Sequence, residues 1–258
     1  MNPSNDRLIV PRRFCGPPSS GNGGWTAGAL AATIPLDAGR GHAWPAVTVA
    51  LRQPPPLDVA LPLTDDGGAR VATYDGRPVA QARRAERDLE PVGPVPADEA
   101  RGAEATYPGL RSHPFPTCFA CGTEREEGDG LRIFPGEVTP EDGQARAAGT
   151  WRPHPSHAED WHEYRDDVPH ASLPVTWAAL DCVGAWAADM ADRPMVLGTM
   201  TARVDALPAI DEEHVVVGAA RGQEGRKTFT ASTLYDADGR VVACAEHVWI
   251  TIEPAAFA

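Results

Sequence analysis

Two stretches of the chain are almost uncharged and apolar on every side. Residues Trp25–Ile34 and Trp177–Met190 both begin at a tryptophan and continue mainly with alanine, leucine and valine. A helix with no polar face cannot lie against water and has to be covered by other elements. Both stretches therefore predict a buried helix.

Alternation of apolar and polar residues after each helix predicts antiparallel strands. Two similar segments, Ala69–Ala82 and Thr230–Ala245, each place two such strands around a short turn with Asp and Gly, which predicts a β-hairpin. Further strands are predicted at Ala46–Leu51, Val59–Leu63, Val196–Val204, Glu213–Gly218 and Lys227–Tyr235.

The order of helix, strands and hairpin thus occurs twice in the chain. We expect an α+β fold of two similar units, each a long buried helix wrapped by an antiparallel β-sheet, over residues 1–90 and 117–258. Residues 91–116 belong to a charged region rich in Ala, Pro and Gly and are expected to form a solvated linker.

Composition narrows the class of partner. The 258 residues carry a net charge of −13, which argues against nucleic-acid binding. Lys227 is the only lysine, so a few arginines would have to form any local phosphate site. The chain has no run of about 18 apolar residues and no apolar N-terminal leader, so we expect a soluble, cytoplasmic protein without a membrane partner.

Three short motifs resemble the double hotdog fold of type-II acyl-CoA thioesterases. Gly23-Gly24-Trp25 is similar to the start of their N-terminal helix, Trp177–Asp181 to the start of their C-terminal helix, and Gly239–Ile250 to their closing strand. The resemblance covers both halves but not residues 83–130. It implies an acyl-CoA or another acyl thioester as substrate, no required cofactor, and leaves a homo-oligomer open.

Asp181 is the first candidate catalytic residue. It interrupts an otherwise apolar helix, where an unpaired carboxylate is costly to bury. The resemblance implies that this aspartate is a general base that activates water. The alternative from the residues alone is a structural Asp held near the helix N-terminus by backbone N–H groups.

The resemblance also implies a hydroxyl and an amide beside this aspartate. The hydroxyl falls at Thr199 or Thr201, and the amide position holds His247, which departs from the family pattern. A histidine can replace the hydrogen bonds of an amide, but it also titrates near neutral pH. A structural role for His247 stays open beside the catalytic one.

Asn22, Gly23 and Gly24 predict an oxyanion-binding helix start. Two glycines without side chains let a substrate carbonyl approach the free N–H groups of the first turn. The alternative is an ordinary N-cap at Ser20 or Asn22 with glycines that permit close packing. The substrate is expected between the two helices, with Trp25 and Trp177 in contact with it.

The sequence Cys118-Phe-Ala-Cys121-Gly122 is a candidate metal knuckle. Two further ligands would be needed for zinc, and nearby histidines are His113, His154, His157, His162 and His170. Free buried thiols are the alternative for these cysteines. For the whole protein, the alternatives to hydrolysis are a non-catalytic acyl-CoA or small hydrophobic ligand-binding module and a hotdog hydratase or dehydratase.

Overall fold

The computed structural model describes residues 6–35, 43–158 and 168–253. Within these ranges the α-helices are α1 (Gly23–Ala31), α2 (Ala97–Ala103) and α3 (Leu173–Ala187). Short 3-10 turns lie at Arg12–Phe14, Glu104–Thr106, Pro108–Leu110 and Pro155–His157. No helix in this part of the chain is both long and apolar enough to cross a membrane.

One antiparallel sheet of eleven strands contains both halves of the chain, in the order β1-β3-β4-β5-β2-β8-β11-β10-β9-β7-β6. The strands are β1 (Arg7–Leu8), β2 (Trp44–Leu51), β3 (Leu61–Asp66), β4 (Ala69–Tyr74), β5 (Arg77–Arg84), β6 (Gly136–Glu141), β7 (Gln144–Trp151), β8 (Met195–Val204), β9 (His214–Glu224), β10 (Lys227–Tyr235) and β11 (Val241–Thr251).

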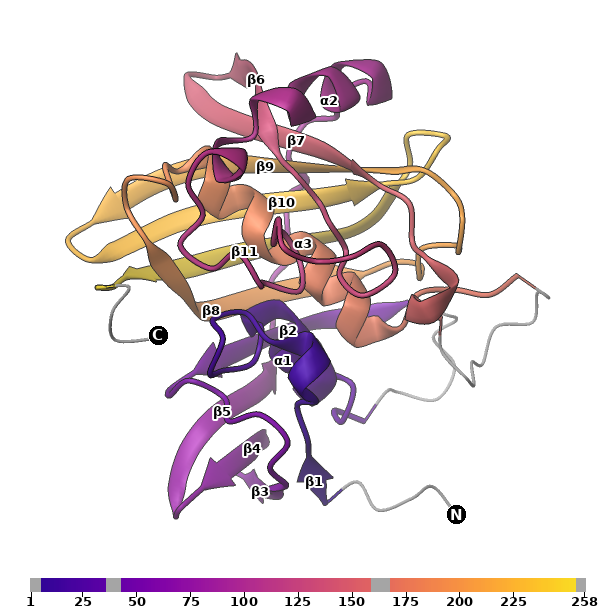
Figure 1. Ribbon diagram of the computed structural model, residues 1–258. Coiled ribbons are helices and arrows are strands. Elements are labelled where there is room, and N and C mark those ends of the chain that lie inside the picture. Colours follow the sequence, from indigo (N-terminus) through magenta and orange to yellow (C-terminus); the bar gives the residue numbers. More distant parts are fainter. Residues whose placement is uncertain (1–5, 36–42, 159–167, 254–258) are drawn as a thin grey trace.

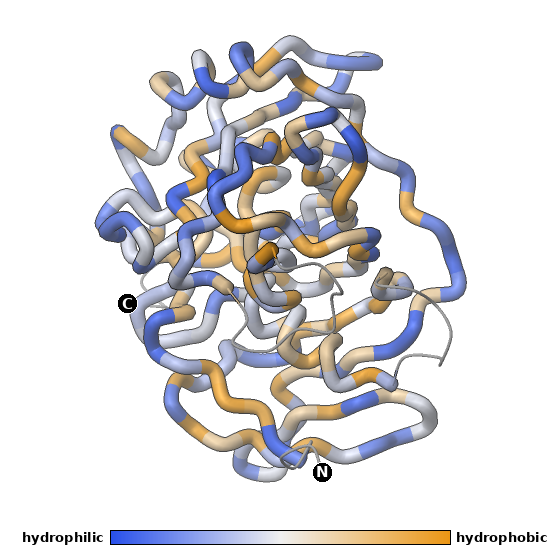
Figure 2. Tube along the Cα trace, turned by 90° about the vertical axis from the view of Figure 1, so that its right-hand side faces the viewer, coloured by the Kyte–Doolittle hydropathy of each residue, from blue (hydrophilic) through white to orange (hydrophobic). Residues whose placement is uncertain are grey.

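The two halves of the sheet meet where β2 pairs with β8. At this seam the hydroxyls of Thr48 and Thr201 lie 2.8 Å apart. Helix α1 packs on β2 and β5, helix α3 packs on β7 to β11, and the two helices pack on each other. Figure 1 shows both helices on the same side of the sheet. Figure 2 shows hydrophobic and hydrophilic positions interspersed along the trace. Strand β10 is buried at nearly every position, because an apolar cluster covers each of its faces.

Both buried helices begin earlier than their tryptophans. Asn22 caps α1 by accepting from the Trp25 N–H, and Ser172 caps α3 by accepting from the Val175 N–H. Helix α1 has 9 residues, so it is not the long helix expected, whereas α3 has 15. Nearly every residue of α3 is buried, which confirms that the sheet covers this apolar helix.

The two predicted hairpins are confirmed as β4–β5 and β10–β11. The first turns at Asp75 and Gly76, with φ values of 47° and 72°, the left-handed backbone that a tight hairpin turn requires.

Residues 91–116 contain more structure than the expected linker. Helix α2 and two 3-10 turns lie within them, and α2 packs on β6 and β7. Val92, Val95 and Ala100 are buried in a second apolar cluster. These apolar residues are spaced among Pro and charged residues. Local composition therefore does not indicate that this segment packs on the sheet.

The hairpin β6–β7 has no counterpart among the predicted strands. Strand β6 contributes one large buried apolar side chain, Val138, and β7 is mainly alanine and polar residues. Its strand conformation depends on pairing with β9, which tertiary structure supplies.

Candidate active site

Two glycines bring α1 unusually close to α3. A Cβ at Gly24 would lie 2.7 Å from the Asp181 Cβ, and a Cβ at Gly28 would lie 2.7 Å from the Trp177 Cβ. Within each helix the two residues are one turn apart and share a face. Glycine at both positions therefore lets the start of α1 lie directly against Asp181.

Asp181 is held through one of its two oxygens. Its Oδ2 accepts hydrogen bonds from Asn22 Nδ2 at 2.9 Å and from the Gly24 N–H at 3.0 Å. Its Oδ1 is buried and has no hydrogen-bond partner among residues 6–35, 43–158 and 168–253. One oxygen is therefore fixed by α1, and the other has unused hydrogen-bonding capacity.

Burial raises the pKa of Asp181 to about 7. The hydrogen bonds from Gly24 and Asn22 act in the opposite direction, and the nearby Cys118 adds to the increase. The only charged residue of α3 is therefore much easier to protonate than an exposed aspartate.

The first turn of α1 offers one N–H group beside Asp181 that the described hydrogen bonds do not use. The Gly24 N–H binds Asp181, and the Trp25 N–H binds Asn22 Oδ1 at 2.8 Å. The Gly23 N–H takes part in none of the hydrogen bonds found in the described ranges, and Gly23 lines the adjacent cavity. Of these three N–H groups, that of Gly23 is therefore the remaining candidate for the predicted oxyanion donor.

A cavity of about 290 Å³ lies beside Asp181, close to the lower end of the range for ligand pockets, about 300 Å³. Asn22, Gly23 and Asp181 contribute to its wall. Most of the remaining wall is apolar and includes Leu51, Phe115, Met195, Leu197, Trp249 and Ile250. The cavity suits an apolar group with a polar end near the carboxylate.

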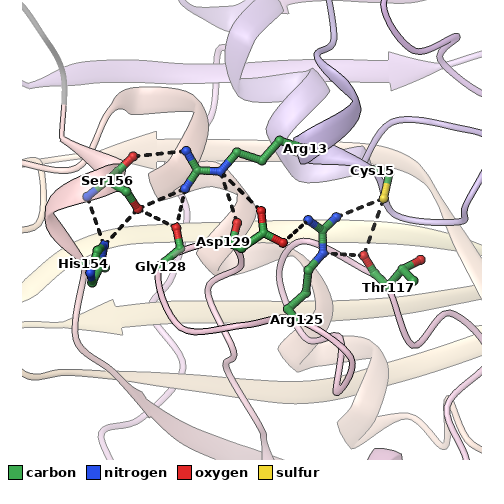
Figure 3. Close-up of polar contacts among 8 residues, drawn as sticks. All are labelled: Arg13, Cys15, Thr117, Arg125, Gly128, Asp129, His154 and Ser156. Carbon is green, nitrogen blue, oxygen red and sulfur yellow. Dashed lines mark hydrogen bonds and ion pairs between the residues drawn. The ribbon is translucent and has the colours of Figure 1, made fainter.

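The segment before α1 is tied to the segment that carries Cys118 (Figure 3). Arg13 donates to the carbonyl oxygens of Gly128 and Asp129, at 2.6 and 3.2 Å. The buried Arg125 donates to the Thr117 carbonyl at 2.7 Å and to the Cys15 sulfur at 3.0 Å. These contacts hold the segment that leads to Asn22 against the segment that carries Cys118. Asn22 and Cys118 both contribute to the wall of the cavity.

The structure does not bring Thr199 and Thr201 to Asp181. Cross-strand partners share a face, and Thr201 pairs with Glu246 and Thr199 with Val248. Both threonines line a separate cavity with Arg87 and Glu246, on the face of the sheet away from the helices. Strand alternation places their neighbour Met200 in the core instead.

His247 faces the helices but has a different set of partners. Its Nδ1 lies 3.2 Å from the Thr230 hydroxyl, which also accepts from Trp249 Nε1 at 2.9 Å. No contact within the described ranges joins His247 to Asp181, and burial lowers the pKa of His247 to about 4. This neutral, buried histidine fits the structural alternative.

Trp25 and Trp177 lie in the core rather than in the wall of the main cavity. Trp25 stacks on Phe14 with ring centroids 4.3 Å apart, and Trp177 covers Gly28. His170, one of the histidines near the knuckle in the sequence, forms a β-bridge with Ala209 and does not line this cavity.

Cys118 and Cys121 meet a third cysteine, Cys182, which directly follows Asp181. The three sulfurs lie within 4.8 Å of one another, and Cys121 Sγ lies 3.4 Å from His113 Nε2. His154, His157 and His170 are not in this cluster, and His162 lies outside the described residues. The spacing of cysteines in the sequence does not indicate that Cys182 belongs to this cluster, because only the packing of α3 brings it close to Cys118 and Cys121.

Hydrogen bonds from the two neighbouring thiols hold the pKa of Cys118 well below its ordinary value. Burial raises the pKa of Cys121, and the hydrogen bond with Cys118 raises that of Cys182. The first thiol of the cluster to ionise is therefore Cys118.

No protein-family model matches the chain, and no curated protein matches it in sequence. Solved structures do match over nearly its whole length. A putative thioesterase II from Thermobifida fusca has a TM-score of 0.59 and 12% identity, over 98% of this chain and 94% of its own. The acyl-CoA thioesterase II TesB2 of Mycobacterium marinum has a TM-score of 0.55 and 13% identity, over 93% and 92%.

A protein of unknown function from Alicyclobacillus acidocaldarius, described as having a hot dog fold, has a TM-score of 0.56 and 15% identity, over 96% of this chain and 92% of its own. At these identities the likeness establishes the fold. The chain is therefore a hotdog-fold protein whose structural neighbours include thioesterase-type proteins.

Proposed function

We propose that the protein hydrolyses an acyl thioester, such as an acyl-CoA, in the cavity beside Asp181. The observation that carries this proposal is the buried carboxylate in the cavity wall, with Oδ2 fixed by α1 and Oδ1 without a partner in the described ranges. The substrate class is supported by two structural neighbours, one described as a putative thioesterase II and the other as an acyl-CoA thioesterase II.

In this mechanism the ionised Asp181 is the general base. A water molecule attacks the thioester carbonyl carbon while Asp181 Oδ1 takes one of its protons. The electrons of the carbonyl double bond move to oxygen, which accepts a hydrogen bond from the Gly23 N–H. As the carbonyl re-forms, the C–S bond breaks, and the sulfur leaves with the proton returned by Asp181.

The mechanism assigns no step to Thr199, Thr201 or His247, because no described contact joins their side chains to Asp181. Asn22 is a positioning residue, since its amide holds the carboxylate and its carbonyl oxygen caps α1. Trp25 and Trp177 act through packing of the helices.

We further infer that the chain consists of two fused hotdog units. The support is that α1 packs on strands of the first half and α3 on strands of the second half, with β2 and β8 forming the seam. In this proposal residues 91–116 connect the units, with α2 covering the second one.

A panel of short-chain, medium-chain and aryl acyl-CoAs tests the function. We expect free CoA and carboxylic acid as products, separated by chromatography so that the protein's five cysteines do not interfere. A single turnover in ¹⁸O-labelled water should place the label in the acid, whereas an unlabelled acid would indicate attack by Asp181 itself. Hydration of an enoyl-CoA, or tight binding of acyl-CoA without turnover, would contradict the proposal.

A further inference from the structure

We propose that Cys118, Cys121 and Cys182 bind one zinc ion as thiolates, in the wall of the cavity that contains Asp181. The three side chains supply three of four tetrahedral positions, and the fourth faces the cavity. This site is independent of the proposed hydrolysis, because no step of that mechanism uses a cysteine.

The sulfur positions fit the size of a zinc ion. Zinc–sulfur bonds of about 2.3 Å in a tetrahedron place two sulfurs about 3.8 Å apart. The sulfurs of Cys118 and Cys182 are 3.9 Å apart, and all three sulfurs lie within 4.8 Å of one another. A ligand set made only of thiolates selects a soft ion such as zinc over magnesium or calcium.

The knuckle has the required conformation before any ion binds. The Gly122 N–H donates to the Cys118 carbonyl at 2.8 Å, and a Cβ at Gly122 would lie only 2.5 Å from that oxygen. The Tyr107 hydroxyl donates to the Cys121 carbonyl at 3.1 Å. The turn is therefore held closed around the two sulfurs by its own backbone and by a buried tyrosine.

Two N–H donors face the sulfurs. Asn22 Nδ2 lies 3.6 Å from Cys118 Sγ, and His113 Nε2 lies 3.4 Å from Cys121 Sγ. The Phe115 N–H donates to His113 Nδ1 at 2.9 Å, so the neutral ring carries its proton on Nε2. The Nε2 proton of His113 thus points at Cys121, whose carbonyl oxygen lies at 3.2 Å and whose sulfur lies at 3.4 Å, so His113 is not a fourth ligand. N–H donors beside a metal-bound thiolate stabilise it.

Charge balance also favours an ion at this place. Burial favours neutral thiols, and a divalent ion that replaces their three protons leaves a net charge of only −1, which the two N–H donors face. Because Cys182 belongs to α3 and Cys118 to the knuckle, the ion would clamp the knuckle to the helix that carries Asp181.

Metal analysis of the full chain tests the site. Protein purified without chelators and then exposed to zinc should retain one ion per chain after gel filtration. Cobalt in place of zinc should give an intense thiolate-to-cobalt charge-transfer band and the visible bands of a tetrahedral ion. Less than a tenth of an ion per chain, or no charge-transfer band, would overturn the proposal, as would a disulfide between any two of the three cysteines.

Single variants identify the ligands. Cys118→Ser, Cys121→Ser and Cys182→Ser should each lower bound zinc at least tenfold, whereas Cys244→Ser, at a buried cysteine outside the cluster, should retain it. His113→Ala should keep the ion and weaken its retention against a chelator. Full zinc content in a folded Cys182→Ser protein, judged by circular dichroism, would refute this ligand set.

Discussion

The backbone N–H of Gly24 donates to Asp181 Oδ2 at 3.0 Å, although the two residues are 157 positions apart in the chain. The contact places the positive end of the α1 backbone against the one charged side chain of α3. Each half of the chain thus supplies a part of the site: the donors come from α1 and the carboxylate comes from α3.

The close approach at this contact predicts that Gly24→Ala is harmful. The new Cβ would overlap the Asp181 Cβ and the Trp177 carbonyl, at 2.7 and 2.8 Å, so α1 and α3 would have to separate. We expect a loss of about 1–3 kcal/mol in the free energy of unfolding, measured with denaturant. We also expect kcat for the thioester to fall at least tenfold.

Gly102→Ala is the matched control, because Gly102 lies in α2 and a Cβ there would meet nothing within 4 Å. This change should leave kcat unaltered and raise stability by up to about 1 kcal/mol. Equal behaviour of the two variants would show that the helices can absorb a methyl group at Gly24.

Asn22 combines two roles that one substitution separates. Asn22→Ser keeps an oxygen that can cap α1 but removes the Nδ2 donor to Asp181. We expect the free energy of unfolding to fall by about 1–3 kcal/mol, because the buried Asp181 carboxylate loses a hydrogen bond. We also expect a lower kcat. Asn22→Ala should cost roughly 1 kcal/mol more, because the cap is also lost. An Asn22→Ser enzyme with wild-type kcat would exclude the positioning role.

Helices α1 and α3, hairpins β4–β5 and β10–β11, and the position of Asp181 follow from the sequence because they depend on local patterns. An apolar stretch with one carboxylate identifies α3, and an Asp/Gly turn between alternating strands identifies β4–β5. Strand alternation puts Thr199 and Thr201 on one face, but it does not tell which face the helices cover; the structure pairs them with Val248 and Glu246, away from the helices.

Cys182 illustrates a second limit of the sequence. The spacing of Cys118 and Cys121 indicates a knuckle, but only the packing of α3 shows which residue faces it. Helix α2 and hairpin β6–β7 were missed for a related reason, since weakly apolar segments become ordered by burying a few side chains against β9.

The buried His247 predicts a specific pH dependence of stability. Burial lowers its pKa to about 4 in the folded protein from an ordinary value of 6.5, so below pH 6.5 the unfolded chain binds a proton that the folded protein does not. Stability that His247 provides at neutral pH is therefore lost as the pH falls from 6.5 towards 4. The Thr230 backbone, the nearby Glu246 and the Leu180 backbone oppose this lowering of the pKa only in part.

His247→Gln removes this titration and keeps a hydrogen-bonding side chain. The difference in unfolding free energy between wild type and variant should shrink by roughly 2 kcal/mol between pH 7.5 and pH 5. Because the comparison is between two proteins, other titrating groups cancel. A difference that stays constant with pH would mean that folding does not shift the pKa of His247.

The most direct test of the account is the rate of acyl-CoA hydrolysis by Asp181→Asn, compared with wild type and with Asp66→Asn at the exposed end of β3. Asparagine preserves the size of the side chain but cannot take a proton from water. We predict that kcat falls at least 100-fold in Asp181→Asn, the scale of general-base catalysis, and stays unchanged in Asp66→Asn. A folded Asp181→Asn protein that hydrolyses the same substrate within threefold of the wild-type rate would contradict the central claim.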